Sequence, residues 1–255
     1  ISCIDSDDNE WYEVPSLATD TIFEDMENNS ENDPTSVINR DVAPYILKLK
    51  KTARRFTTFI NEDEVRPLVD ECDLIYHLAA AVGVNFIIEN PLSSLISNIR
   101  GTEIILELAN ERKKKVVIAS TSEIYGKKNG NVPFSEDSDR ILGPTTVIRW
   151  NYSTSKAVDE LFALAYWREK RLPCVIVRPF NVIGPRQSGH YGMVVPRFVK
   201  QALLGHPITV YGDGEQRRCW TYIGDALDGL IGLATTDSAV GEIFNLGSHL
   251  EARFQ

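Results

Sequence analysis

Residues 115–120, Lys-Val-Val-Ile-Ala-Ser, form a short apolar run that follows two lysines and leads into Thr-Ser-Glu. A continuous run of β-branched residues of this length is typical of a strand that is buried on both faces of a parallel sheet. Two similar runs lie on either side of it, residues 73–80 (DLIYHLAA) and residues 174–181 (CVIVRPFN). Helical patterns at residues 92–112 and 152–169 separate the three runs. Strands that alternate with long helices predict an α/β fold with a parallel sheet.

Polar and small residues follow each predicted strand. Ala79 and Ala80 end the first strand, residues 120–123 (Ser-Thr-Ser-Glu) follow the second, and Asn181 ends the third. Ligands of parallel α/β sheets bind beyond the carboxyl ends of the strands. We therefore expect these residues to converge on one crevice, together with Tyr152.

The helix predicted after residue 150 carries a pair of residues with chemical potential. Tyr152 and Lys156 are four residues apart in Arg-Trp-Asn-Tyr-Ser-Thr-Ser-Lys (149–156), so both side chains leave one face of the helix. An adjacent ammonium favours the phenolate and lowers the pKa of a tyrosine, which makes the phenol a base for a sugar hydroxyl. The pair alone is weak evidence, because a solvated helix face has the same appearance.

Length and composition are those of a globular protein. The chain has 255 residues, of which 43% are apolar and 25% charged, and no apolar run reaches membrane-spanning length. Its N-terminus has neither the basic nor the apolar region of a secretory signal. The chain begins at Ile1, which is compatible with a fragment or a processed form.

The acidity of the chain lies in one segment. Residues 1–40 contain eleven Asp or Glu and one Arg, a balance of −10, whereas the whole chain carries −9. This segment has no sustained periodicity, so we expect a disordered or loosely attached tail that does not bind nucleic acid. A docking arm for another chain is an alternative, with Trp11 and Phe23 among its apolar contacts.

Residues 43–55 predict a short basic helix, and residues 61–71 predict a helix that begins at the polar Asn61. Four cysteines and four histidines show no metal-ligand spacing, so we expect no metal site and free thiols in a reducing compartment, the cytoplasm.

Several motifs between residues 56 and 248 occur in a characteristic order. They include DLIYHLAA, NIRGT, VVIASTSEIYG, YSTSK, VRPFNVIGPRQ, ITVYGDGEQRRCWTYIGDAL and FNLGS. Together they resemble the extended short-chain dehydrogenase/reductase family of NAD-dependent nucleotide-sugar epimerases, dehydratases and decarboxylases. Bacterial UDP-glucuronate decarboxylases are the most similar members.

The resemblance implies a Rossmann-like parallel sheet with a smaller C-terminal substrate lobe. The first glycine of the chain is Gly83, so no earlier segment supplies the family's GxxGxxG loop. The expected fold therefore lacks the usual first βαβ unit, and the family's C-terminal segment is also missing. The expected domains are an acidic tail (1–40), an incomplete cofactor domain (41–181) and a truncated substrate lobe (182–255).

The resemblance also implies roles for individual residues. The catalytic residues would be Tyr152 as base, Lys156 as its activator, Thr121 and Glu123. The groove for NAD would be lined by Ala79, Ala80, Asn98, Ser120, Tyr152, Lys156 and Pro179. The UDP-sugar would contact Ser122, Asn181, Val195, Phe198, Tyr211 and Arg218.

The position of Glu123 narrows the implied reaction. Decarboxylases and 4,6-dehydratases carry an acid at this position, whereas simple 4-epimerases have small residues there. The resemblance thus favours decarboxylation of UDP-glucuronate, with 4-epimerisation or 4,6-dehydration as alternatives. Two alternatives remain open. Glu123 serves only as the cap of a turn, or the whole chain is a truncated, non-catalytic homologue that binds a partner. The family also implies a homodimer through a four-helix bundle of residues 92–112 and 152–170.

Overall fold

The computed structural model describes residues 62–127, 133–185, 187, 193–210, 212, 214 and 217–248, the side chains of residues 64, 84 and 85 excepted. Outside these ranges it describes only strands. The chain divides into two compact units, Ile1–Ile60 and Asn61–Gln255. This division falls C-terminal to the domain boundary that the sequence predicts at residue 40.

The first unit contains strands at positions where the sequence predicts other structure. Strands β1 (Ser2–Ile4), β2 (Glu10–Glu13) and β5 (Arg55–Phe56) form one sheet. Strands β3 (Thr21–Glu27) and β4 (Tyr45–Lys51) form an antiparallel pair. Three of these strands lie in the acidic segment that we expected to lack regular structure. The basic helix predicted over residues 43–55 is wrong, because β4 occupies it.

The register of β3 and β4 pairs seven residues of each strand. Glu24 is the register partner of Lys48, and Phe23 is the register partner of Leu49. The alternation of leucine and lysine in β4, which we interpreted as helical, is the period-2 pattern of a strand.

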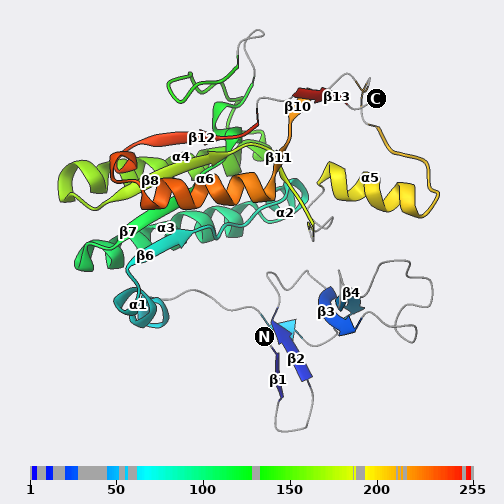
Figure 1. The fold of residues 1–255 in the computed structure, drawn as a ribbon, viewed down its shortest axis with the longest axis horizontal. Helices are drawn as coiled ribbons and strands as arrows, with labels where there is room; N and C mark the ends of the chain where they lie inside the picture. The colour runs from blue at the N-terminus through cyan, green and yellow to red at the C-terminus, as the bar shows by residue number, and fades with distance from the viewer. Residues whose placement is uncertain are drawn as a thin grey trace. The chain divides into compact units, whose positions relative to one another are not determined.

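The second unit is built on a four-stranded parallel sheet, as the sequence predicts. Its strands are β6 (Leu74–His77), β7 (Lys115–Ala119), β8 (Cys174–Pro179) and β12 (Ile243–Leu246), in the order β12-β8-β7-β6 (Figure 1). All three pairings are parallel. Their carboxyl ends therefore share one edge of the sheet.

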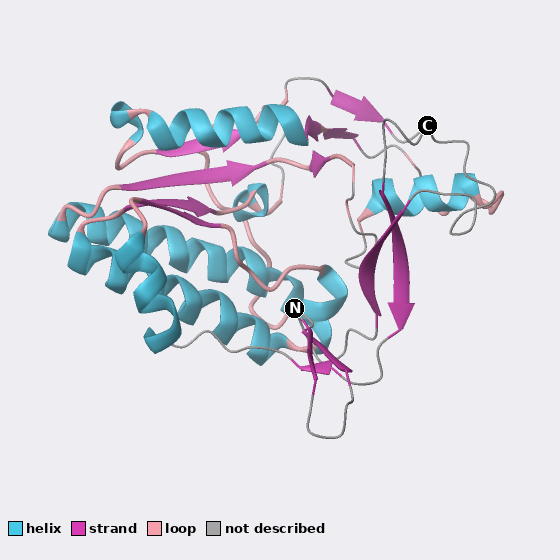
Figure 2. Ribbon diagram, turned by 60° about the horizontal axis from the view of Figure 1, so that its bottom comes forward, coloured by secondary structure: helices cyan, strands magenta, loops and turns pink. Residues whose placement is uncertain are grey.

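Helices cover both faces of this sheet (Figure 2). Helices α1 (Glu62–Glu71), α3 (Pro91–Arg112) and α4 (Asn151–Ala165) pack on one face, and α6 (Ile223–Thr235) packs on the other. Helix α4 continues into a π-helical turn, η3 (Tyr166–Lys170). Helix α2 (Val84–Glu89) precedes α3, and short 3-10 turns are η1 (Ser122–Tyr125), η2 (Ile148–Trp150) and η4 (Asp237–Ala239). The helices predicted at 61–71, 92–112 and 152–169 are thus confirmed.

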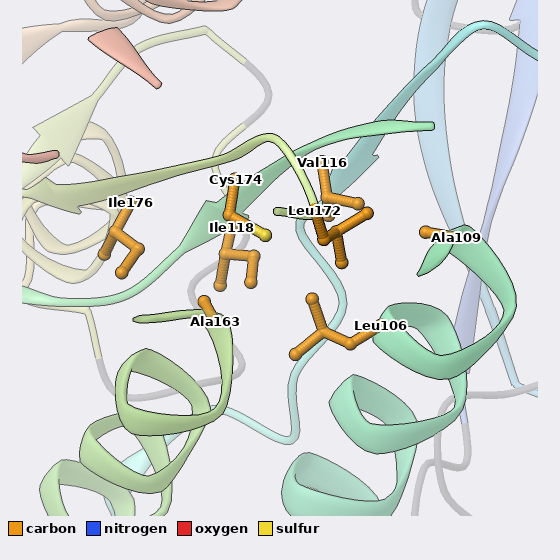
Figure 3. Packing of buried hydrophobic residues seen from close by; sticks show 8 residues of the cluster. All are labelled: Leu106, Ala109, Val116, Ile118, Ala163, Leu172, Cys174 and Ile176. Carbon is orange, nitrogen blue, oxygen red and sulfur yellow. The ribbon is translucent and has the colours of Figure 1, made fainter. Parts of the chain in front are cut away.

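The core lies between the sheet and α3 and α4. Val116, Ile118 and Ile176 of the strands are at most 1% exposed and pack against Leu106 of α3 and Ala163 of α4 (Figure 3). Burial of such side chains contributes about 1.5–3 kcal/mol each. The opposite face of the sheet packs Val117, Val175 and Val177 against α6. This double burial explains why the strands are continuously apolar.

A group of shorter elements follows Asn181. Strand β9 (Val182–Ile183) pairs in parallel with β11 (Thr221–Tyr222), and β10 (Arg217–Cys219) pairs antiparallel with β13 (Glu251–Arg253). Helix α5 (Val194–Leu203) lies between these strands in the sequence. None of the helices in the described part of the chain is long and apolar enough to cross a membrane.

Candidate active site

Tyr152 lies in the first turn of α4, next to the end of β7. Its phenol lies close to Thr121, the residue that caps η1. Thr121 is extended and buried, and its hydroxyl accepts a hydrogen bond of 3.2 Å from the Glu123 amide. The structure thus brings together three residues that the sequence places in one site. The side-chain cap of η1 is therefore Thr121, and Glu123, which we also considered as a cap, contributes its backbone amide to this bond.

The pKa of Tyr152 differs in direction from the sequence-based expectation. Burial raises this pKa to about 12, and the negative charges of Glu123 and Asp159 act in the same direction, whereas the nearby Thr121 hydroxyl lowers it. The expected lowering by Lys156 is therefore wrong for this state of the protein. The reason is the position of the Lys156 ammonium, which donates to Asp159 Oδ2 at 3.0 Å. No hydrogen bond joins Lys156 to Tyr152 among the described residues.

Two effects of opposite sign act on the pKa of Glu123. The residue as a whole is exposed, but the protein atoms around its carboxyl raise the pKa by desolvation, and the Arg149 guanidinium lowers it. Arg149 itself stacks over the Trp150 ring, 4.9 Å from the ring centroid. Tyr152, Glu123 and Arg149 therefore bring a phenol, a carboxyl and a guanidinium close together.

A buried polar layer lies beneath this group. Asp159 is fully buried and Lys156 is 2% exposed. His77, at the end of β6, is hydrogen-bonded through Nε2 to Thr102 Oγ1 at 3.0 Å. Burial and the Lys156 charge lower the pKa of His77 to about 4, so this imidazole is neutral at pH 7. Neither His77 nor Asp159 was predicted as a site residue, although Asp159 follows Lys156 by one helical turn.

Asn98, predicted to line the cofactor groove, is a buried connector in α3. Its Oδ1 accepts from the Ala81 amide at 2.6 Å, and its Nδ2 donates to Ser155 Oγ at 3.2 Å. It therefore fixes the loop after β6 against α4. Ala79 and Ala80 directly precede Ala81, the residue that Asn98 holds; Ala79 is exposed and Ala80 is half-buried.

A second buried network connects α4 with the sheet. Glu160 accepts two hydrogen bonds from Arg178 of β8, at 2.8 and 2.7 Å, and one from Ser120 Oγ. Arg178 also donates to the Tyr125 hydroxyl at 2.8 Å, and Tyr125 donates to Asn245 Oδ1 at 2.6 Å. Ser120, predicted to contact the cofactor, thus uses its hydroxyl inside this network. Neither Glu160 nor Arg178 was predicted as a site residue. Arg178 belongs to the quoted motif VRPFNVIGPRQ, but only the fold reveals its pairing with Glu160.

The residues at the end of β8 lead into the second group of elements. Pro179 ends the strand, half-buried, and Asn181 adopts φ 40°, a left-handed conformation that asparagine tolerates. The Asn181 side chain donates to the Cys219 carbonyl at 3.0 Å, and its own carbonyl accepts from the Thr221 amide. Asn181 thus connects the sheet with β10 and β11.

The other predicted substrate residues lie on separate elements. Val195 of α5 lines a groove of about 500 Å³, together with Gly184, Pro185, Gln187, Pro196, Val199, Lys200, Leu203 and Leu204. Phe198 lies beneath the Arg197 guanidinium, Arg218 is exposed on β10, and Ser122 is half-buried in η1. Tyr211 is outside the described residues. Across the part of the chain that is described, no three His, Cys, Asp or Glu side chains are placed to hold a metal ion.

The sequence matches the model of the NAD dependent epimerase/dehydratase family over residues 24–247. The chain belongs to this family. It is 44% identical to a UDP-N-acetyl-alpha-D-glucosaminuronate decarboxylase of Bacillus cytotoxicus over 78% of its length, and 38% identical to UDP-glucuronic acid decarboxylase 1 of Xenopus tropicalis over 75%. It spans 61% and 45% of the length of these relatives.

Solved structures of the epimerase/dehydratase family share the fold. One is UDP-glucuronic acid 4-epimerase from Bacillus cereus in complex with UDP-glucuronic acid and NAD. It is 32% identical, with a TM-score of 0.67, and the alignment covers 80% of this chain and 63% of that structure. Both the predicted family and the predicted Rossmann-like α/β fold are thereby confirmed.

Lys156 has the chemistry to hold the nicotinamide ribose of NAD. Its ammonium has three N–H groups, and among the described residues only Asp159 accepts a hydrogen bond from it. The remaining N–H groups would donate to a ribose hydroxyl. The residues present do not fit the pyrophosphate of NAD in the same way. No residue before Gly83 is a glycine, and glycine is the residue that lets the backbone approach the phosphates.

Proposed function

We propose that this protein acts on a UDP-sugar acid as an NAD-dependent enzyme, and that its reaction is the decarboxylation of UDP-glucuronate. The observation that carries the proposal is the group formed by Tyr152, Thr121 and Glu123 at the carboxyl end of β7. A phenol, a hydroxyl and a carboxyl in one place can orient a sugar hydroxyl and manage its proton. The decarboxylase relatives support the choice of reaction.

Each residue has one task in this proposal. Thr121 holds the 4-hydroxyl of the sugar by a hydrogen bond, and Tyr152 takes the proton of that hydroxyl. Reversible hydride exchange at C4 would be the chemistry that bound NAD supplies, with uptake before the loss of carbon dioxide and return to the ketone afterwards. The resulting ketone is β to the sugar carboxylate, so the bond between C5 and C6 breaks with loss of carbon dioxide. Glu123, whose pKa is raised by desolvation, would give a proton to C5 of the sugar after carbon dioxide has left.

Substrate and cofactor would be held at the ends of the strands. Lys156, with Ala79, Ala80, Asn98, Ser120 and Pro179 around it, would lie along the nicotinamide ribose. Asn181, Val195, Phe198, Tyr211 and Arg218 would hold the nucleotide diphosphate, and Ser122 the sugar. Arg218 is exposed, and a guanidinium matches phosphate oxygens in geometry and charge.

The experiment combines cofactor binding with product analysis. Quenching of tryptophan fluorescence by NAD measures binding, and mass spectrometry of the product from UDP-glucuronate identifies the reaction. We expect a product that has lost carbon dioxide. An unchanged mass with inverted C4 would identify a 4-epimerase. A 4,6-dehydratase would instead remove water from UDP-glucose, whose C6 carries the hydroxyl that leaves, and would not change UDP-glucuronate.

A second candidate function is that of a non-catalytic binding protein. The absence of glycine before Gly83 favours it, because a backbone loop for the pyrophosphate is then missing from that segment. Failure to bind NAD at millimolar concentration would support this function and exclude the enzymatic one for this chain.

We also propose that two copies associate through α3 and α4. Three large apolar side chains are exposed on these helices, Leu92 (70%), Ile96 (56%) and Leu161 (64%). Exposed apolar side chains that gather on one surface mark interaction sites. Two such helices from each copy would form a four-helix bundle.

A further inference from the structure

The ion pair of Lys156 and Asp159 is placed to control the phenol of Tyr152. Lys156 Nζ and Asp159 Oδ2 are 3.0 Å apart, and the side chains are 2% and 0% exposed. Asp159 Oδ1 is buried and accepts no hydrogen bond from the described residues. A carboxylate this deeply buried costs folding free energy unless it interacts strongly with its partner.

The charges around the phenol come from four elements. Lys156, Asp159 and Glu160 lie on α4 itself, Glu123 on η1, Arg149 on η2 and the neutral His77 on β6. Lys156 is a cation within the buried layer, and Asp159 neutralises it at hydrogen-bond distance. The Lys156–Asp159 pair, which is neutral as a whole, therefore stabilises the phenolate of Tyr152 little.

We propose that Asp159 is a positioning residue that holds the Lys156 ammonium away from Tyr152 and keeps the phenol protonated in the ligand-free protein. The geometry supports this assignment, because residues 156 and 159 are one turn apart on the same face of α4. The same ammonium can serve Tyr152 only when another acceptor competes with Asp159. The role of the phenol as a base rests on the proposed function, but its protonation does not.

The test is a titration of Tyr152 in the intact chain. Tyrosine labelled with ¹³C at Cζ reports ionisation of each phenol by NMR, and the Tyr152→Phe variant assigns the resonance. We expect Tyr152 of the wild type to stay protonated up to the highest pH at which the circular dichroism spectrum is retained. Asp159→Asn should lower its titration midpoint by at least about one pH unit, since it removes a nearby negative charge.

Two further variants separate this role from a structural one. Lys156→Met/Asp159→Asn removes both charges, so its titration midpoint should fall less than that of Asp159→Asn. Asp159→Glu, which restores the carboxylate, should return the midpoint toward the wild type. A folded Asp159→Asn protein with an unmoved Tyr152 midpoint would overturn the proposal.

Asp159→Asn leaves a buried ammonium without its partner and is expected to be less stable. If it does not fold, Asp159→Ser replaces it, because the smaller side chain admits water to the ammonium. We expect Asp159→Ser to lower the titration midpoint of Tyr152 as Asp159→Asn does, and an unmoved midpoint would again contradict the proposal. The readout needs neither NAD nor substrate, so failure of the proposed enzymatic function would leave this result interpretable.

Discussion

At the scale of single residues, Tyr152 is the side chain on which the proposed chemistry depends. Its phenol contacts Thr121 and lies near Glu123, whereas its activator Lys156 is bound to Asp159. The residue types at this site were predicted from the sequence. The effect of these residues on the pKa of Tyr152 was not predicted, because the charged side chains around the phenol come from four different elements.

The substitution Tyr152→Phe removes the proposed base without removing the ring. We expect turnover of UDP-glucuronate with NAD to fall by about a hundredfold or more, the usual contribution of a general base. Tyr166→Phe, a change of the same type in the turn that follows α4, is the control and should retain activity. A rate of Tyr152→Phe close to the wild type would disprove the assignment.

His77 predicts a pH dependence of stability. Its pKa in the folded protein is about 4, below the value of 6.5 for a free histidine, so protons bind preferentially to the unfolded chain. Stability from this group is complete above pH 6.5 and is lost as the pH falls toward 4. Between pH 7 and pH 5 the loss amounts to about 2 kcal/mol.

Urea unfolding at several pH values measures this effect. His77→Gln keeps a polar group that can bond Thr102 but does not titrate, so its stability should fall less over the same interval. Parallel curves for the two proteins would show that His77 does not titrate as expected.

At the scale of elements, the Glu160–Arg178 pair fixes α4 against the sheet. Arg178→Met leaves the Glu160 carboxylate buried without its cation, and we expect a loss of about 3–5 kcal/mol in the free energy of unfolding. The double variant Glu160→Met/Arg178→Met should recover most of this loss, because it buries no charge. Guanidinium unfolding followed by circular dichroism tests both.

The matched control is an ion pair on the surface. Arg112→Gln breaks the exposed pair with Asp70, and the unfolding midpoint should not change measurably. Equal effects of Arg112→Gln and Arg178→Met would contradict the importance of the buried network.

At the scale of the whole molecule, the exposed apolar side chains of α3 and α4 predict self-association. Leu161→Glu places a charge in the proposed bundle, and we expect it to sediment as a monomer of 28.6 kDa at concentrations where the wild type is a dimer. Leu227→Glu on α6, at the opposite face of the sheet, is the control and should remain dimeric. A monomeric wild type would exclude the dimer.

The sequence by itself determined the parallel sheet, its helices and the family, because apolar periodicity and ordered motifs are local properties of the chain. It also located Tyr152, Thr121 and Glu123 at the ends of strands. It misjudged residues 43–55, where alternating leucine and lysine were interpreted as a helix rather than as strand β4.

Only the tertiary structure decided which partner each buried charge has. Lys156 lies four residues from Tyr152 and three from Asp159, and both neighbours are compatible with a helix. Burial made the difference, because a desolvated ammonium is stabilised far more by a carboxylate than by a neutral phenol.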